Sequence, residues 1–117
     1  MKAFIISLSI IILIFTFTIA NSIYVGNATD FLIKEAKKLN VSDGSVDTFL
    51  TLWESKQIII RLSSSHEETH KIDEALAILK AKAQAKEENG FSEHKALLVE
   101  YLEQIHEDET ITFDNII

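Results

Sequence analysis

The strongest constraint on the fold is an uncharged apolar run at the start of the chain. From Ala3 to Ala20 there is no charged residue, and the only polar side chains are serines and threonines. A helix of this length spans about 27 Å, close to the hydrocarbon thickness of a bilayer. The sequence therefore predicts a transmembrane segment over residues 1–25, with Tyr24 near the membrane interface.

This segment has two interpretations, an uncleaved signal anchor and a cleavable signal peptide. Small residues stand at the −3 and −1 positions of a possible cut after Ala20. The apolar run exceeds the core of about 7–15 residues that secretory signals usually have, which favours the anchor. Lys2 favours an N-terminus inside the cell, whereas Lys34, Lys37 and Lys38 oppose it. We expect a single-pass protein of the cell membrane, with its C-terminal domain extracytoplasmic.

Residues 26–117 are expected to form one small extracytoplasmic domain that is largely helical. They suffice for a single modest core. The chain has no proline and only three glycines, so helix is the default expectation. It also has no cysteine, which excludes disulfides and thiolate metal sites.

Apolar residues recur at helical spacing through this domain. Residues 28–39 would continue the membrane helix outward as a stalk. The stripes of three further helices are Val46, Phe49, Leu50, Trp53 and Ile60, widened by Ile58, Ile59 and Leu62, then Ile72, Leu76, Leu79 and Ala83, then Leu97 or Leu98, Tyr101, Leu102 and Ile105. Phe49, Trp53 and Tyr101 are predicted in the core or at its edge. The fold class is all-α, with a small antiparallel three-helix bundle and an irregular C-terminal tail, briefly extended at residues 110–113.

Polar residues between the stripes predict where these helices begin and end. Asp43 and Ser45 are competent N-caps for the first of the three, and the serines at 63–65 offer a cap for the next. The Asn-Gly pair at 89–90 predicts the end of that second helix, and Ser92 is the expected N-cap of the last one.

The net charge of −7 is concentrated in one stretch of the chain. Residues 66–109 carry twelve acidic side chains against five lysines, whereas residues 21–65 are balanced. An acidic domain repels phosphate backbones, so nucleic acid is not an expected partner. The acids at 107–109 are predicted to form a solvated end.

One short motif raises the question of a metal site. His66, Glu67 and His70 spell H-E-x-x-H. On a helix the two histidines share a face, and the glutamate can deprotonate a metal-bound water. A catalytic zinc needs a third protein ligand. The candidates are His94, His106, Glu93 and Glu100.

The surroundings of this motif count against zinc chemistry. Glu68 and Lys71 are charged, which is typical of a solvated helix face rather than of a helix buried against a sheet. Outside residues 110–113 no strand pattern is available to align a peptide substrate. We predict no catalytic residue, no cofactor and no metal site, and therefore no enzyme. The alternative is a metal-binding protein or zinc-dependent hydrolase that uses His66 and His70.

Three stretches of the chain stand in an order that resembles a known family. They are the helix with Trp53, the stretch HEETHKIDEALAILKA from His66, and the closing LVEYLEQIHEDETITFDNII from Leu98. This order resembles short bacterial single-pass membrane proteins whose domain has no known function, and it covers essentially the whole chain. In that family a histidine followed by acids is usual at His66, whereas His70 is not expected. The resemblance implies a helical extracytoplasmic domain, and it carries no active-site residues.

These observations predict a membrane-tethered helical accessory or interaction protein. Its first partner is the membrane itself, through the N-terminal helix. A second candidate partner is another membrane or cell-envelope protein. The alternative to the tether is a soluble helical protein that is exported after cleavage at Ala20.

Overall fold

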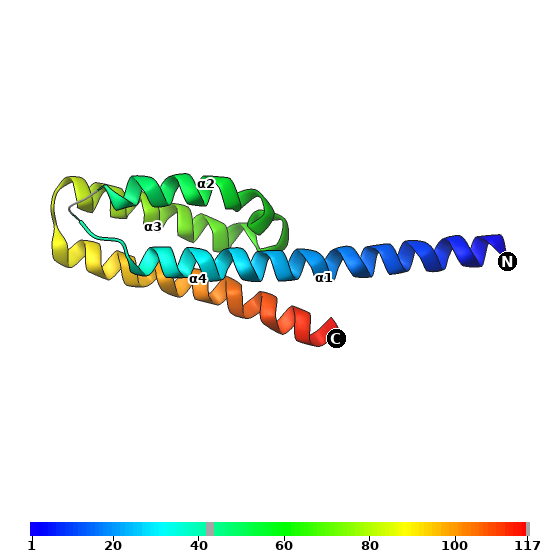
Figure 1. The fold of residues 1–117 in the computed structure, drawn as a ribbon. Coiled ribbons are helices and arrows are strands. Elements are labelled where there is room, and N and C mark those ends of the chain that lie inside the picture. Colours follow the sequence, from blue (N-terminus) through cyan, green and yellow to red (C-terminus); the bar gives the residue numbers. More distant parts are fainter. Residues whose placement is uncertain (42–43, 117) are drawn as a thin grey trace.

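The computed structural model describes residues 1–41 and 44–116, except for the side chains of Ser63 and of residues 110–116. Within this part of the chain all the regular secondary structure is helical, which confirms the all-α class (Figure 1). The four helices are α1 (Lys2–Lys37), α2 (Ser45–Ser63), α3 (His66–Gln84) and α4 (Glu88–Ile116).

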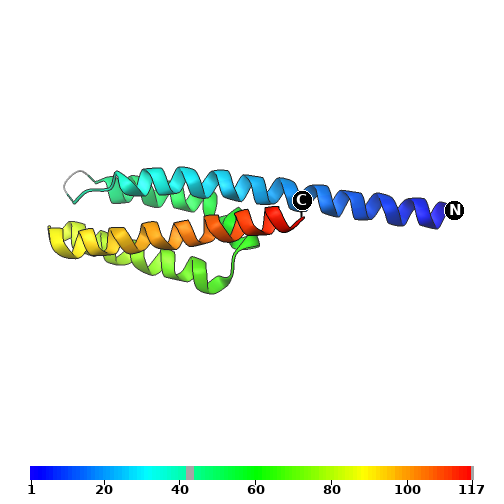
Figure 2. The same ribbon diagram turned by 90° about the horizontal axis from the view of Figure 1, so that it is seen from below.

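Helix α1 determines the shape of the molecule. It is an unbroken helix of 36 residues, which corresponds to a length of about 54 Å. Its N-terminal half projects alone from the rest of the protein, whereas its C-terminal half lies among the other helices (Figures 1 and 2). The molecule is therefore a rod of 68 × 22 × 21 Å. The N-terminal part of α1 is long and apolar enough to cross a membrane.

The other helices form a four-helix bundle with the second half of α1, rather than the predicted bundle of three. Among the described residues α1 packs against α2 and α4, and α3 packs against the same two helices. The chain turns back at each loop, so the α2–α3 loop and the end of α4 both lie on the side of the projecting half of α1 (Figures 1 and 2). The predicted stalk is thus one wall of the bundle. Leu32 and Ala36 of its stripe are completely buried, as is Val25 one turn before it, because α2 and α4 cover this face.

The core is built from the predicted stripes, except that Ile58 and Leu62, which were expected to widen the first stripe, are exposed. Phe49 and Trp53 are buried, and Tyr101 is partly buried at the edge of the core, as predicted. The indole Nε1 of Trp53 donates to Asp73 Oδ1 at 2.9 Å. Arg61 Nη2 donates to the other oxygen of that carboxylate at 2.7 Å. These bonds join α2 to α3 and satisfy the only polar atom of the buried indole ring.

Two of the predicted helix boundaries differ from the structure. Ser65 caps α3 as expected, because its side chain accepts from the Glu68 backbone N–H at 3.2 Å. The predicted Asn-Gly stop is wrong, since residues 89–90 lie in the first turn of α4 and Ser92 lies inside that helix. The turn is made earlier, where Lys86 takes a left-handed conformation with φ 56°. Local backbone geometry at a lysine is not visible in a hydrophobic pattern.

The C-terminal tail also differs from the prediction. It continues α4 as a regular helix to Ile116, so the irregular tail and the extended segment at 110–113 are wrong. The alternation there is too short to outweigh a helix whose preceding turns pack against α1. At the other end of the bundle, Ser45 is the first residue of α2 rather than its N-cap, and the N-cap is Gly44, whose φ is 70°. The cap proposed at Asp43 lies outside the described residues.

Candidate functional site

The H-E-x-x-H motif lies in the first turns of α3, on the surface of the bundle. The rings of His66 and His70 stack with centroids 6.0 Å apart and an interplanar angle of 20°. Both residues are exposed. His70 Nε2 lies 3.1 Å from Glu74 Oε1, and Glu67 reaches within 4.0 Å of Lys71 Nζ. The motif is therefore a pair of surface histidines among their own helix's carboxylates.

The candidate third ligands are not brought to this pair. His94 Nδ1 bonds the Gly90 carbonyl at 2.9 Å within α4, and His106 faces α1. Glu93 and Glu100 are exposed on α4. In the described part of the chain, no three metal-ligating side chains come close enough to hold one ion. Of the candidate zinc ligands, only His66 and His70 lie together, on one face of α3.

A different group of polar residues is buried where α1 meets α4. This group, which we call the α1–α4 polar layer, consists of Ser22, Gly26, Thr29, His106 and Glu109. Ser22, Thr29 and Glu109 are buried, with at most 9% of their surface exposed. The layer lies at the end of the bundle from which α1 projects, so it occupies the boundary between the bundle and the membrane-length half of α1 (Figure 1).

Two hydrogen-bonded clusters make up this layer. In the first, the Ser22 hydroxyl lies 3.0 Å from Glu109 Oε2 and 3.2 Å from the Glu109 carbonyl oxygen, and it donates to them. In the second, His106 Nδ1 lies 3.0 Å from both the Gly26 carbonyl oxygen and Thr29 Oγ1. The small residues of α1 allow α4 to approach closely enough for these bonds.

The second cluster fixes where His106 carries a proton. A carbonyl oxygen only accepts hydrogen bonds, so the contact with Gly26 requires the proton on Nδ1. The Thr29 hydroxyl donates to the Val25 and Gly26 carbonyls of its own helix, at 2.9 and 3.0 Å. Its oxygen can therefore accept from His106. The imidazole is held as an Nδ1–H donor at the surface of α1.

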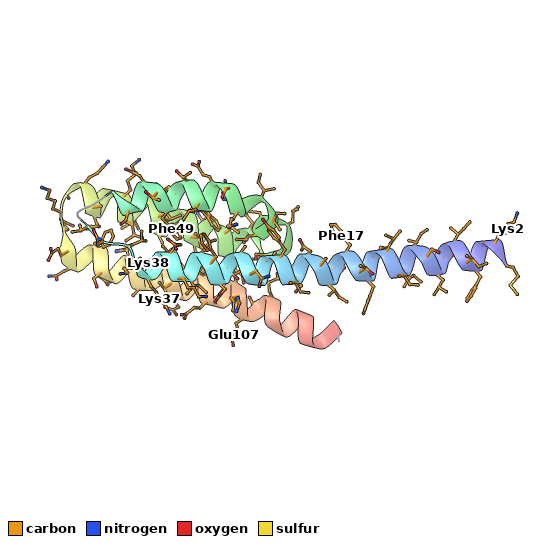
Figure 3. All side chains as sticks on the ribbon, in the orientation of Figure 1. Lys2, Phe17, Lys37, Lys38, Phe49 and Glu107 are labelled. Atoms are coloured by element: carbon orange, nitrogen blue, oxygen red, sulfur yellow. The ribbon has the colours of Figure 1, made fainter. Side chains whose placement is uncertain are left out.

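The first cluster holds the carboxyl group of Glu109 in a buried position, which disfavours its charged form. Burial raises the pKa of Glu109, the Ser22 hydrogen bond lowers it, and the neighbouring charge of Asp108 raises it again, with a net upward shift. The acids at 107–109 were predicted to be solvated. For Glu109 this is wrong, since its exposed fraction is 9%, whereas Glu107 points away from the bundle on the outer face of α4 (Figure 3).

Glu68 and Asp108 form a pair of carboxyl groups next to this layer, between α3 and α4. The pKa of Glu68 is raised, first by burial and then by its hydrogen bond and charge interaction with Asp108. The Ser65 backbone bond and the charge of Lys71 lower the pKa by less. One end of the bundle therefore holds two carboxyl sites that favour protonation, each linking α4 to another helix.

Sequence reasoning missed the polar layer, although a signal for it exists. Ser22, Gly26 and Thr29 follow one another at spacings of four and three, which places them on one face of α1. His106 and Glu109 share a face of α4 in the same way. A stripe of small and polar residues within an otherwise apolar helix favours a close helix–helix contact that satisfies polar groups. Which helix lies opposite is decided by the tertiary fold.

Comparison with known proteins gives a family and no further relatives. The family model DUF4363, described as a domain of unknown function, matches residues 27–116. No curated protein and no solved structure matches the chain. The matched region begins just after the apolar segment and contains the stalk half of α1 together with the other three helices.

Proposed function

We propose that this chain, which belongs to the DUF4363 family of unknown function, is a membrane-tethered helical interaction module. In this proposal the N-terminal half of α1 crosses the membrane, and the bundle stands on the extracytoplasmic side as a binding surface for another membrane or cell-envelope protein. The module acts by binding and positioning its partner rather than by catalysis.

One observation supports the membrane tether. Helix α1 passes without a break from an exposed, uncharged half into a half that is built into the bundle core. Its large apolar side chains from Phe4 to Phe17 are about half or more exposed, whereas Val25 and Leu32 are completely buried. A helix that is apolar all round needs an apolar environment, and its length fits a bilayer. The bundle would be fixed to the membrane by a rigid helix.

The uncleaved anchor is supported by the continuity of the helix through Ala20. Cleavage there would leave Ser22 and the whole bundle stripe in place, so the exported form would fold by the same contacts. The two forms differ in location and in the mature N-terminus rather than in the bundle.

The extracytoplasmic side is supported by the distribution of lysines along α1. Lys2 lies at the N-terminal end of the apolar stretch (Figure 3). Lys34 is the first lysine beyond Ala20, and it lies about 21 Å further along the helix. Lysines count most strongly near the ends of a membrane segment, so Lys2 dominates the orientation.

A binding role is supported by how the titratable groups at this end of the bundle are used. His106 and Glu109 hydrogen-bond α1, and Glu68 bonds α4. Each of these groups joins helices of the bundle. The outer surface is acidic, with most of its charge in α3 and α4, which suits a protein partner with basic character rather than nucleic acid.

Membrane fractionation tests the proposal. The full chain should remain in the membrane pellet after carbonate extraction, with an N-terminus that still includes Lys2. A soluble protein that begins at Asn21 by mass spectrometry would establish the exported form instead. The chain has no cysteine, so a single cysteine at the exposed position Gln84 reports the side of the membrane. A membrane-impermeant maleimide should label it in intact cells, and labelling only after lysis would place the bundle inside.

The partner can be sought with the same protein. Purification of the tagged full chain from membranes, compared with a chain that lacks residues 2–20, should retain one membrane or envelope protein only with the tethered form. Equal recovery of that protein with both forms would mean that the tether does not present the bundle to it.

A further inference from the structure

Large apolar side chains are exposed on the last turns of α2, at the end of the bundle that faces the projecting half of α1. Leu62 is 77% exposed and Ile58, one turn earlier, is 67% exposed. Among the described residues of the bundle, Leu62 is the most exposed large apolar side chain. On α1, Ile23 and Tyr24 are also nearly half exposed at this end.

The height of Leu62 above the apolar segment follows from the pairing of α1 with α2. Lys56 Nζ lies 5.5 Å from the ring centroid of Phe31, and α2 runs back toward the N-terminus of α1 (Figure 1). Six residues beyond Lys56, Leu62 is therefore level with Val25. That level lies about 7.5 Å above Ala20. The headgroup layer is about 5–8 Å thick on each side, so Leu62 stands at its outer edge.

A modest tilt of the rod places Leu62 inside this layer. Membrane helices tilt by about 20° on average, and packed helices lie about 8–10 Å apart. If α1 tilts toward α2 and away from α4, the end of α2 is lowered by about 2 Å. The tether and the bundle share one continuous helix, so a tilt of the span is also a tilt of the bundle.

The polar side chains of the same end determine the direction of that tilt. Glu67, in the first turn of α3, has a side chain that is 82% exposed. Helix α4, which carries the exposed acids Glu107 and Asp108, packs against α1 and α3 and lies diagonally opposite α2. A tilt toward α2 and away from α4, along the diagonal of the bundle, lowers the apolar end of α2 and raises the acids of α4. It leaves α3, with Glu67, at its original level.

We infer that the α2 end of the bundle rests in the headgroup layer of the bilayer, with Leu62 as the contact residue and Ile58 at its outer margin. This inference rests on the proposed membrane tether. The lipid surface is the occupant because Leu62 stands close to the level of the nearly half-exposed Ile23 and Tyr24, just above the membrane-length segment. The bundle would then present a fixed side to its surroundings rather than rotate freely above the membrane.

Site-directed fluorescence on the full chain tests this contact. Because the chain has no cysteine, Leu62→Cys, Glu67→Cys and Ile12→Cys can each carry one environment-sensitive probe in phosphatidylcholine vesicles. Neutral lipid removes charge attraction from the comparison. The probe at Leu62 should show blue-shifted emission and quenching by headgroup-labelled lipid. The probe at Glu67, on the same end of the bundle, should be quenched by aqueous iodide alone.

The probe at Ile12 separates the two proposals, because it reports the membrane span. If it is quenched by acyl-chain-labelled lipid while the Leu62 and Glu67 probes behave alike, the tether stands and the headgroup contact is wrong. If Ile12 is quenched only from water, the tether fails and the headgroup contact fails with it. An Ile58→Cys probe should be quenched less than the Leu62 probe, because Ile58 lies one turn further from the membrane. Stronger quenching at Ile58 than at Leu62 would contradict the inferred contact at Leu62.

Discussion

The two halves of α1 belong to one helix but differ in how their apolar side chains are placed. The N-terminal half is apolar on every face and leaves Phe17 74% exposed. The C-terminal half is apolar on one face only, and it buries Val25, Leu32 and Ala36 against neighbouring helices. A helix that is apolar all round needs an apolar environment on every side, whereas a one-sided stripe packs against neighbouring helices. The difference shows that the pattern around the helix, rather than its helical propensity, assigns each half to its surroundings.

A matched pair of phenylalanines gives the largest test of this comparison. Phe49 is 1% exposed within the bundle and Phe17 is 74% exposed on the projecting half (Figure 3). Phe49→Ala should lower the free energy of unfolding of the bundle by about 3–5 kcal/mol, because it leaves a cavity in the core. Phe17→Ala should leave that free energy within about 0.5 kcal/mol.

Denaturant melts of the full chain in detergent micelles would measure both variants, with the fluorescence of Trp53, the single tryptophan, as the signal. Equal losses of stability would mean that the projecting half of α1 contributes to bundle packing as much as the bundle core does.

The second test makes the same substitution in both halves of α1. Leu32 is completely buried and Leu13 is 69% exposed. Leu32→Ala should destabilise the bundle by about 2–5 kcal/mol, and Leu13→Ala by less than about 0.5 kcal/mol. The same tryptophan melts apply, and carbonate extraction should show both variants still in the membrane. A small effect at Leu32 would show that three helices suffice for the bundle, as the sequence alone suggested.

The sequence predicted those features that depend on neighbours along the chain. The uncharged run from Ala3 to Ala20 predicted a membrane-length helix, and the spacing around Phe49 and Trp53 predicted a buried stripe. Both are local patterns that repeat with the helical period. The stripe of residues 28–39 was also visible, but whether a stripe forms a lone stalk or a bundle wall depends on partners that the period does not identify.

The features that the sequence did not predict depend on contacts between distant residues. Ser22 and Glu109 are hydrogen-bonded although 87 positions separate them, and nothing local distinguishes Glu109 from the solvated Glu107. Likewise, the Asn-Gly pair at 89–90 is a common helix stop, yet the chain turns at Lys86 instead. Register between helices and turn geometry are tertiary properties, which is why the polar layer had to be found in the structure.

The third test concerns the boundary between the two halves of α1, where Ser22 bonds Glu109. The pKa of Glu109 is raised above its ordinary value, chiefly by burial. Between its unfolded and folded pKa values the folded state binds more protons, so this group makes stability fall as the pH rises through that window. Glu109→Gln keeps an oxygen that can accept from Ser22 and removes the titration.

The measured quantity is the difference in unfolding free energy between the wild type and Glu109→Gln at each pH. Relative to the variant, the wild type should gain stability as the pH falls from neutral toward the ordinary carboxyl value. Glu107→Gln, on the exposed face of the same helix, is the matched control and should show no such trend. A trend of the opposite sign would mean that Glu109 is stabilised as a carboxylate and that the Ser22 bond outweighs burial.

The smallest expected effects lie on the polar surface of the bundle, which is exposed like the projecting half of α1 but faces water. His66 and His70 are surface residues on one face of α3, and no third ligand joins them in the described part of the chain. Two exposed histidines at this spacing bind zinc only weakly. Calorimetric titration of the full chain with zinc should therefore show no tight one-to-one site, and His70→Ala should change the free energy of unfolding by less than about 0.5 kcal/mol. His94→Ala is the matched control, since the ring of that residue bonds the Gly90 carbonyl of its own helix. Submicromolar binding that is lost separately with His66→Ala and with His70→Ala would make the exposed face of α3 a metal site rather than solvated surface.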